Sequence, residues 1–241
     1  MYIPPSLRCT LSHEITNLCD EYFHIDETPE ASVPVFCINS SCCIRKSVTC
    51  IVYLTNRLGD FIYSKVYKNK HIDESYAVHA EMFMIYDNYL REKLQKNQTL
   101  TLYLTYQPCH FSGGKIKHSQ LSCTKSIEQF YEKILQPLNI SLVIKFAYIY
   151  RAHWMNAPFR FQNMIQNAVE GLHILKKCAK LEIIDKDDWP IIYHHCSEQV
   201  KKEWDEGKYD LLLQERKKLT LFIKSFLENI YKGDVCHICQ Q

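Results

Sequence analysis

The sequence predicts an α/β fold, in which helices cover the faces of one largely buried sheet. Two observations carry this prediction: short runs with strand periodicity alternate with longer runs with helical periodicity, and neither an internal repeat nor a linker is recognisable in the chain. With 241 residues, of which 46% are hydrophobic and 23% charged, the chain can bury one full core. The net charge of +2 neither favours nor excludes a nucleic-acid partner.

The first part of the chain is predicted to contain one helix and then a β-hairpin. The connection between them is rich in proline and lacks periodicity, whereas the two strands have the apolar, β-branched and aromatic content typical of a sheet. A five-residue loop that includes Gly59 has the length of a hairpin connection. The predicted ranges are a helix over 6–24, an irregular connection over 26–41, and strands over 48–54 and 61–66.

After a polar loop over 68–75, the rest of the chain is predicted to alternate helices with strands. Apolar residues near helical spacing indicate one helix over 78–96. Leucines alternate with threonines over 99–106, which predicts a strand that stops before Pro108. The remaining elements are a loop over 110–122, a helix over 124–135, a strand over 140–150, a helix over 159–176, a strand over 181–184, and helices over about 188–204 and 209–232, the last capped by Gly233.

Twelve cysteines are many for this length, and the redox compartment decides their role. The N-terminal residues MYIPPSLRCT include two early prolines and no apolar stretch, so we expect no signal peptide. The longest apolar run, 140–150, contains Lys145 and is too short to span a bilayer. We therefore expect a protein of the cytoplasm, the nucleus or both, away from membranes, in which most cysteines pack as reduced, small hydrophobic residues.

The strongest functional signal is a histidine, a glutamate and two cysteines at the ends of predicted elements. His79 and Glu81 open a predicted helix, Cys109 follows a strand, and Cys123 begins the next helix. Imidazole and thiolate ligands suit tetrahedral zinc, and three protein ligands leave the fourth position for water. Zinc lowers the pKa of that water toward ~7, and a nearby carboxylate can move its proton. The sequence therefore predicts one catalytic Zn²⁺ held by His79, Cys109 and Cys123, with Glu81 as the proton carrier.

The spacing of the two cysteines leaves the third ligand open. The zinc-deaminase signature H-x-E…P-C-x-x-C has two residues between its cysteines, whereas 13 residues lie between them here. Cys123 is preferred because it begins a helix, while His110 and His118 are alternatives because imidazole also binds zinc. The inserted residues, 111–121, would bulge beside the metal. A further C-x-x-C, Cys236 to Cys239, suits either a second metal or a pair of free thiols.

These motifs together resemble the AID/APOBEC group of polynucleotide cytosine deaminases. The resemblance rests on His79-Ala80-Glu81, on Thr105-Tyr106-Gln107-Pro108-Cys109 and on the order of strands and helices, and it spans about residues 45–205. Many members carry Ser-Trp-Ser where this chain has Thr105-Tyr106-Gln107. The chain resembles divergent branches of the group more than its well-studied vertebrate members.

The resemblance implies a fold, an activity and a division of the chain. The fold is a three-layer, cytidine-deaminase-like arrangement of a five-stranded mixed sheet flanked by about six helices. The activity is zinc-dependent hydrolysis of cytosine to uracil in single-stranded DNA or RNA, with a role in antiviral defence or nucleic-acid editing. The division gives an N-terminal helix and connection over 1–44, a deaminase domain over 45–205, and a C-terminal helix and tail over 206–241.

A base in a polynucleotide must be splayed out and held between aromatic or apolar walls before it is deaminated. Tyr106 and Tyr148 are the candidates for such walls, with Tyr150 and Trp154 behind them, although tyrosines at strand ends are often core or rim residues. Asn69 is similar in position to the family's nucleotide-contacting asparagine.

Two rival functions stay open at this point. One is the deamination of free cytidine or a related nucleotide, and the other is a noncatalytic, zinc-stabilised protein that binds nucleic acid. Lysines and histidines in the loops around the expected site favour a polynucleotide, because such side chains contact phosphates. A glutamate at position 81 favours catalysis, because a purely structural zinc does not need it.

Overall fold

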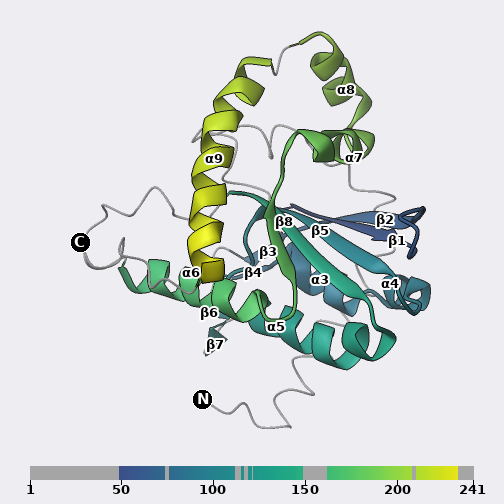
Figure 1. The fold of residues 1–241 in the computed structure, drawn as a ribbon, viewed down its shortest axis with the longest axis vertical. Coiled ribbons are helices and arrows are strands. Elements are labelled where there is room, and N and C mark those ends of the chain that lie inside the picture. The colour runs from purple at the N-terminus through teal and green to yellow at the C-terminus, as the bar shows by residue number, and fades with distance from the viewer. Residues whose placement is uncertain are drawn as a thin grey trace.

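Five strands form the central sheet of the protein (Figure 1). The computed structural model describes residues 49–73, 76–111, 115–116, 119–120, 122–148, 162–207 and 210–232. The strand order is β2-β1-β5-β8-β9; β1 is antiparallel to both of its neighbours, whereas β5, β8 and β9 are parallel. The predicted α/β fold with a five-stranded mixed sheet is therefore confirmed. The strands are β1 (Thr49–Thr55), β2 (Phe61–Lys68), β5 (Thr99–Tyr106), β8 (Ser141–Tyr148) and β9 (Lys180–Ile183).

Alternate residues of the strands enter two separate cores, which gives the molecule three layers. In β1, Cys50, Val52 and Leu54 belong to the larger core, while Ile51 belongs to the smaller one. The larger core lies between the sheet and α3, α5, α6 and α9, and the smaller core lies between the opposite face and α7 and α8. The described residues contain seven α-helices, namely α3 (Ala80–Tyr86), α4 (Asn88–Lys93), α5 (Cys123–Phe130), α6 (Gln162–Leu175), α7 (Trp189–His194), α8 (Glu198–Asp205) and α9 (Asp210–Lys232).

Helix α9 covers the β9 edge of the sheet, where it runs alongside the strands in Figure 1. The hydroxyl of Tyr231 accepts a hydrogen bond from the backbone N–H of Leu181 at 2.6 Å, and Lys176 Nζ donates to the carbonyl of Ile230 at 2.7 Å. Apolar residues of α9, including Ile223 and Phe226, belong to the larger core. The helix therefore shields an edge strand, while the predicted division at residue 205 stays a prediction.

The prediction of one continuous helix over 78–96 is wrong. Val78 ends the strand β4 (Tyr76–Val78), which pairs with β3 (Lys70–Asp73) where a polar loop was predicted. The helical part divides at Asp87, which has an extended backbone with φ −69° and ψ 107°. The Asp87 carboxylate accepts hydrogen bonds from the Tyr89 N–H, from Tyr67 Oη at 2.6 Å and from Lys65 Nζ at 2.9 Å. These contacts with β2 outweigh the helical periodicity.

We expect Asp87→Ala to lower the free energy of unfolding by about 3 kcal/mol, because it removes a helix cap and the buried hydrogen bond that the Tyr67 hydroxyl donates to this carboxylate. Chemical denaturation with urea measures the change. Asp187→Ala is the matched control, because Asp187 is an exposed aspartate and its loss should alter stability by less than about 0.5 kcal/mol. Equal destabilisation by the two substitutions would contradict the role given to Asp87.

Three other predicted elements differ from the structure. The helix over 188–204 is divided into a 3₁₀ turn (Lys186–Asp188), α7 and α8, because Ser197 starts a new helix by accepting a hydrogen bond from the Val200 N–H. The helix over 124–135 ends its α-helical part at Phe130 and continues as a π-helical turn (Tyr131–Leu135) and a 3₁₀ turn (Gln136–Leu138). The loop over 110–122 contains two short paired strands, β6 (Lys115–Ile116) and β7 (Ser119–Gln120).

Several predictions fall outside the described residues: the helix over 6–24, the connection over 26–41, Gly233, Cys236 and Cys239. Within the described ranges, none of the helices combines the length and the apolar character that a membrane span needs. The five cysteines in these ranges are all free thiols.

Candidate metal centre

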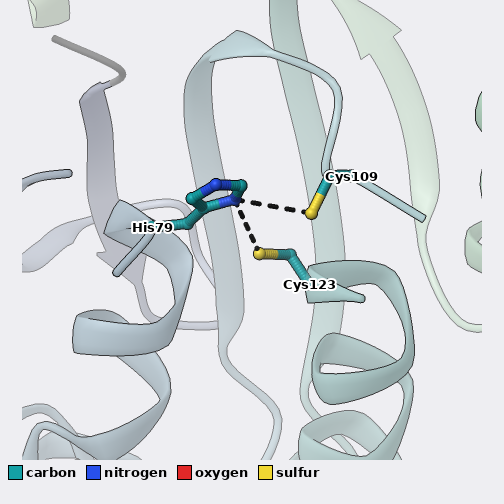
Figure 2. A group of neighbouring side chains, drawn as sticks. All are labelled: His79, Cys109 and Cys123. Carbon is teal, nitrogen blue, oxygen red and sulfur yellow. Dashed lines mark hydrogen bonds between the residues drawn. The ribbon is translucent and has the colours of Figure 1, made fainter. Parts of the chain in front are cut away.

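His79, Cys109 and Cys123 meet although they come from three separate elements (Figure 2). His79 immediately precedes α3, Cys109 follows β5, and Cys123 is the first residue of α5. His79 Nδ1 lies 3.4 Å from Cys109 Sγ and 3.3 Å from Cys123 Sγ, and the three ligand atoms lie within 4.8 Å of one another. The three side chains thus form a group that can hold a metal ion, as the sequence predicts.

The spacing and the chemistry of the three side chains fit zinc. Zinc binds nitrogen at about 2.0–2.1 Å and sulfur at about 2.3 Å. At a tetrahedral angle, these bond lengths place a nitrogen ligand and a sulfur ligand about 3.6 Å apart. The distances of 3.3 and 3.4 Å from His79 Nδ1 to the two sulfurs are close to this value. One imidazole and two thiolates are a donor set that zinc favours, and three protein ligands are the number that catalytic zinc sites use.

The local backbone explains why His79 is available to a metal. The residue is the N-cap of α3 with an extended backbone, φ −77° and ψ 151°, yet its side chain makes no capping hydrogen bond. Its imidazole instead contacts the two cysteine sulfurs. A histidine at a helix start often serves only as a cap. In the described structure His79 does not have this role.

The three groups also share protons. Hydrogen bonds from Cys123 and from His79 hold the pKa of the Cys109 thiol well below its usual value, although burial opposes this. The pKa of Cys123 is raised, first by its hydrogen bond to Cys109 and then by burial. Burial lowers the pKa of His79, but the hydrogen bond and charge of Cys109 raise it to about 9. A metal ion bound by these atoms takes the place of the shared protons, so its binding releases protons.

Glu81 lies in the first turn of α3 and is buried, with 2% of its surface exposed. Its Oε2 atom has no hydrogen-bond partner among the described residues. Burial raises the pKa of Glu81 to about 7, with a smaller opposing effect from the charge of His79. A carboxyl group with this pKa can both accept and give a proton near neutral pH.

The two alternative ligands have different outcomes. His110 is buried, and its ring nitrogens contact Ser122 Oγ at 2.9 Å and Glu170 Oε1 at 3.7 Å rather than joining the metal group. Burial lowers the pKa of His110, which favours the neutral ring. His118 lies outside the described residues. Among the residues that the structure describes, Cys123 is thus the third member of the group.

The insertion between the two cysteines lies beside the metal group. Its first strand, β6, contacts β4, and β4 ends one residue before His79. Phe111, the first residue of the insertion, packs its ring against His110 with centroids 4.4 Å apart, whereas the side chains over 112–121 lie outside the described part of the chain.

The residues predicted to bind substrate are only partly described. Tyr106 and Tyr148 end neighbouring parallel strands in register, with ring centroids 5.8 Å apart, and both contact the smaller core. Tyr148 is 6% exposed, whereas Tyr106 and Asn69 are half-buried. Tyr150 and Trp154 lie outside the described residues. A role for these residues in holding a base stays a prediction.

Sequence reasoning did not identify the contribution of Ser122 and Gly171 to the site. Ser122 is the N-cap of α5, and its hydroxyl forms a hydrogen bond with His110. A serine at the start of a predicted helix was the sequence signal for this role. Gly171 lies in α6 where a Cβ would approach the Cβ of His110 to 2.7 Å, and a glycine inside a helical pattern is the signal for such a close contact.

Family models and curated proteins were compared with the chain. No protein-family model matches the chain, and a search of curated proteins finds no significant match. The likeness to the AID/APOBEC deaminases is accordingly carried by the motifs of the chain alone.

Proposed function

We propose that the protein is a zinc-dependent hydrolytic deaminase that converts cytosine to uracil in single-stranded DNA or RNA. The observation that supports this most is the burial of Glu81 two residues after a member of the metal group. A buried carboxyl with one oxygen that has no hydrogen-bond partner among the described residues destabilises a fold, so its presence needs a reason beyond stability. A zinc that only closes the fold gives no such reason, whereas proton transfer does.

In this proposal His79, Cys109 and Cys123 hold the ion, and zinc, when bound, supplies Lewis-acid activation of a water molecule. Glu81 accepts the proton of the attacking water and delivers it to the ring nitrogen of cytosine. A second proton then passes through Glu81 to the departing amine, so that one water is consumed and ammonia leaves. A carboxyl pKa of about 7 suits a group that must both take and give a proton.

A polynucleotide is the proposed substrate because aromatic and cationic residues lie close to the metal-group residues along the chain. Tyr106 is half-buried beside Tyr148 at the end of the sheet from which Cys109 emerges. Lys68 and Lys70 flank Asn69 in the segment that leads through β3 and β4 to His79. Such a protein would meet its substrate in the cytoplasm or the nucleus, and the resemblance to AID/APOBEC proteins suggests nucleic-acid editing or antiviral defence as its purpose.

The test offers zinc-loaded protein three substrates of the same base: a single-stranded DNA oligonucleotide with one cytosine, the matched RNA, and free cytidine. Uracil in an oligonucleotide, lost on chelation of zinc and restored by its addition, is the expected result. Product from cytidine alone would replace the proposal with a nucleoside deaminase. One tightly bound zinc per chain without any product would favour a noncatalytic protein.

We expect Tyr106→Ala to weaken binding of the single-stranded oligonucleotide by about 5- to 150-fold, because stacking on an aromatic ring contributes about 1–3 kcal/mol per base. Fluorescence anisotropy with a labelled oligonucleotide measures the change. Tyr89→Ala is the control, since Tyr89 is an exposed tyrosine on α4, outside the metal group. Equal affinity of the Tyr106→Ala variant and the unaltered protein would remove Tyr106 from the substrate site.

A further inference from the structure

The chain between Cys109 and Cys123 is too long to fix the distance between these two residues. Two intervening residues hold the cysteines of a C-x-x-C motif together, whereas 13 residues intervene here. A longer connection permits many more separations of its ends. Both sulfurs nevertheless lie within 3.4 Å of the same histidine nitrogen, so other contacts must hold the ends of the insertion together.

One hydrogen bond joins the two residues at the base of the insertion. His110 directly follows Cys109, Ser122 directly precedes Cys123, and His110 Nδ1 lies 2.9 Å from Ser122 Oγ. Both residues are buried, with 1% and 6% of their surfaces exposed. Ser122 Oγ also accepts a hydrogen bond from the backbone N–H of Lys125, and this bond fixes the hydroxyl to the first turn of α5. The neighbour of one cysteine is thereby tied to the helix that starts with the other.

The surrounding residues hold this bond in place. The Thr124 N–H donates to the carbonyl of Cys109 at 3.0 Å, and Thr124 Oγ1 donates to the carbonyl of Pro108 at 3.3 Å. On the side of α6, a Cβ at Gly171 would lie 2.7 Å from His110 Cβ and 3.1 Å from Thr124 Oγ1. Only glycine lets α6 approach this closely, so His110 is enclosed between α5 and α6.

We propose that His110 and Ser122 are positioning residues of the metal centre. Their hydrogen bond closes the base of the insertion and does what the short connection does in a C-x-x-C motif: it sets the separation of Cys109 and Cys123 before the metal binds. The inference rests on the metal centre of the proposed function, but not on deamination. Residues that orient metal ligands in this way typically account for about 10–100-fold in metal affinity.

Two amide substitutions at position 110 separate the hydrogen bond from packing. The amide of asparagine places a polar atom near the position of imidazole Nδ1, whereas the amide of glutamine reaches the position of Nε2. We expect His110→Gln to weaken zinc binding by about 10–100-fold and His110→Asn to remain close to the unaltered protein. If packing alone mattered, His110→Asn would weaken zinc binding more than His110→Gln, because glutamine fills the histidine volume better.

Competition with a chromophoric chelator measures the zinc affinity of both variants. Co²⁺ substitution adds a spectroscopic signature: of the two variants, only His110→Gln should weaken the strong visible absorption of tetrahedral Co²⁺.

Substitutions in α6 complete the test. Gly171→Ala favours the helix but displaces His110, so it should weaken zinc binding in a folded protein even if His110→Gln does not fold. Glu170→Gln is the control, because the Glu170 carboxylate is 65% exposed and 3.7 Å from His110 Nε2. This substitution should leave zinc affinity unchanged.

Two results would overturn the role of the hydrogen bond. One is normal zinc affinity in both His110→Gln and Gly171→Ala, and the other is an equal loss of affinity in His110→Asn and His110→Gln. An unaltered protein that binds no zinc would overturn the metal centre itself, and the proposed function with it.

Discussion

Replacing Glu81 with glutamine should reduce deamination by about 10²–10⁴-fold while the fold and the zinc stay in place. Glutamine has nearly the same shape but cannot accept the proton of the attacking water. It is also uncharged, so the free energy needed to bury a carboxylate disappears, and thermal stability should not fall. Loss of activity without loss of stability is the pattern expected of a residue kept for chemistry.

Single-turnover formation of uracil, measured together with zinc content and melting temperature, tests this expectation. Glu92→Gln is the matched control, because Glu92 is an exposed glutamate on α4 and should leave the rate unchanged. A Glu81→Gln variant that keeps its zinc and the unaltered rate would show that another group moves the proton. Loss of zinc from the variant would instead make Glu81 part of the metal-binding set.

The strands of the central sheet were the most predictable part of the fold. The alternation of leucine and threonine over 99–106 gives the range of β5 without error, because one face of that strand packs in the larger core. Helix boundaries were less predictable where tertiary contacts decide them. Asp87 interrupts a helical pattern because Tyr67 and Lys65, twenty or more residues earlier, donate hydrogen bonds to its carboxylate. Periodicity contains no information about such partners.

The metal group was predictable in its members but not in its geometry. Residue types and their positions at element ends select His79, Cys109 and Cys123, since few side chains suit zinc. Their convergence depends on how α3, β5 and α5 pack, and the wide cysteine spacing left His110 as an alternative ligand. Only burial against Ser122 and α6 assigns His110 a different role, because a neutral imidazole suits a ligand and a hydrogen-bond partner equally well.

The burial of Glu81 could not be predicted from the sequence either. An acidic residue in the first turn of a helix is usually explained by its favourable interaction with the helix dipole, in contact with water. Here α3 packs on β1 and β2, and Glu81 lies close enough to the buried Cys50 of β1 to raise the pKa of that thiol, in addition to the larger effect of burial. The packing of α3 on the sheet thus turns an ordinary surface position into a buried carboxyl at the metal group.

Replacing Cys123 with alanine should abolish stoichiometric zinc binding, because only His79 and Cys109 of the metal group would remain. The stabilisation by zinc should disappear with it. A ligand that binds only the folded state stabilises it by about 2.7 kcal/mol at a free concentration of 100 times Kd and by about 4.1 kcal/mol at 1,000 times Kd. Chelation should therefore lower the melting temperature of the unaltered protein but not that of Cys123→Ala.

Cys178→Ala is the matched control for this experiment. Cys178 is a partly buried free thiol outside the metal group, and its Sγ donates only to the carbonyl of Leu175 among the bonds that the described structure assigns to it. The control should keep one zinc and its response to chelation. Cys123 is fully buried, so its truncation also removes packing, and comparing the two metal-free proteins isolates that loss. If Cys123→Ala still bound one zinc with unaltered affinity, the third ligand would be a different residue, and His118 would be the first to replace.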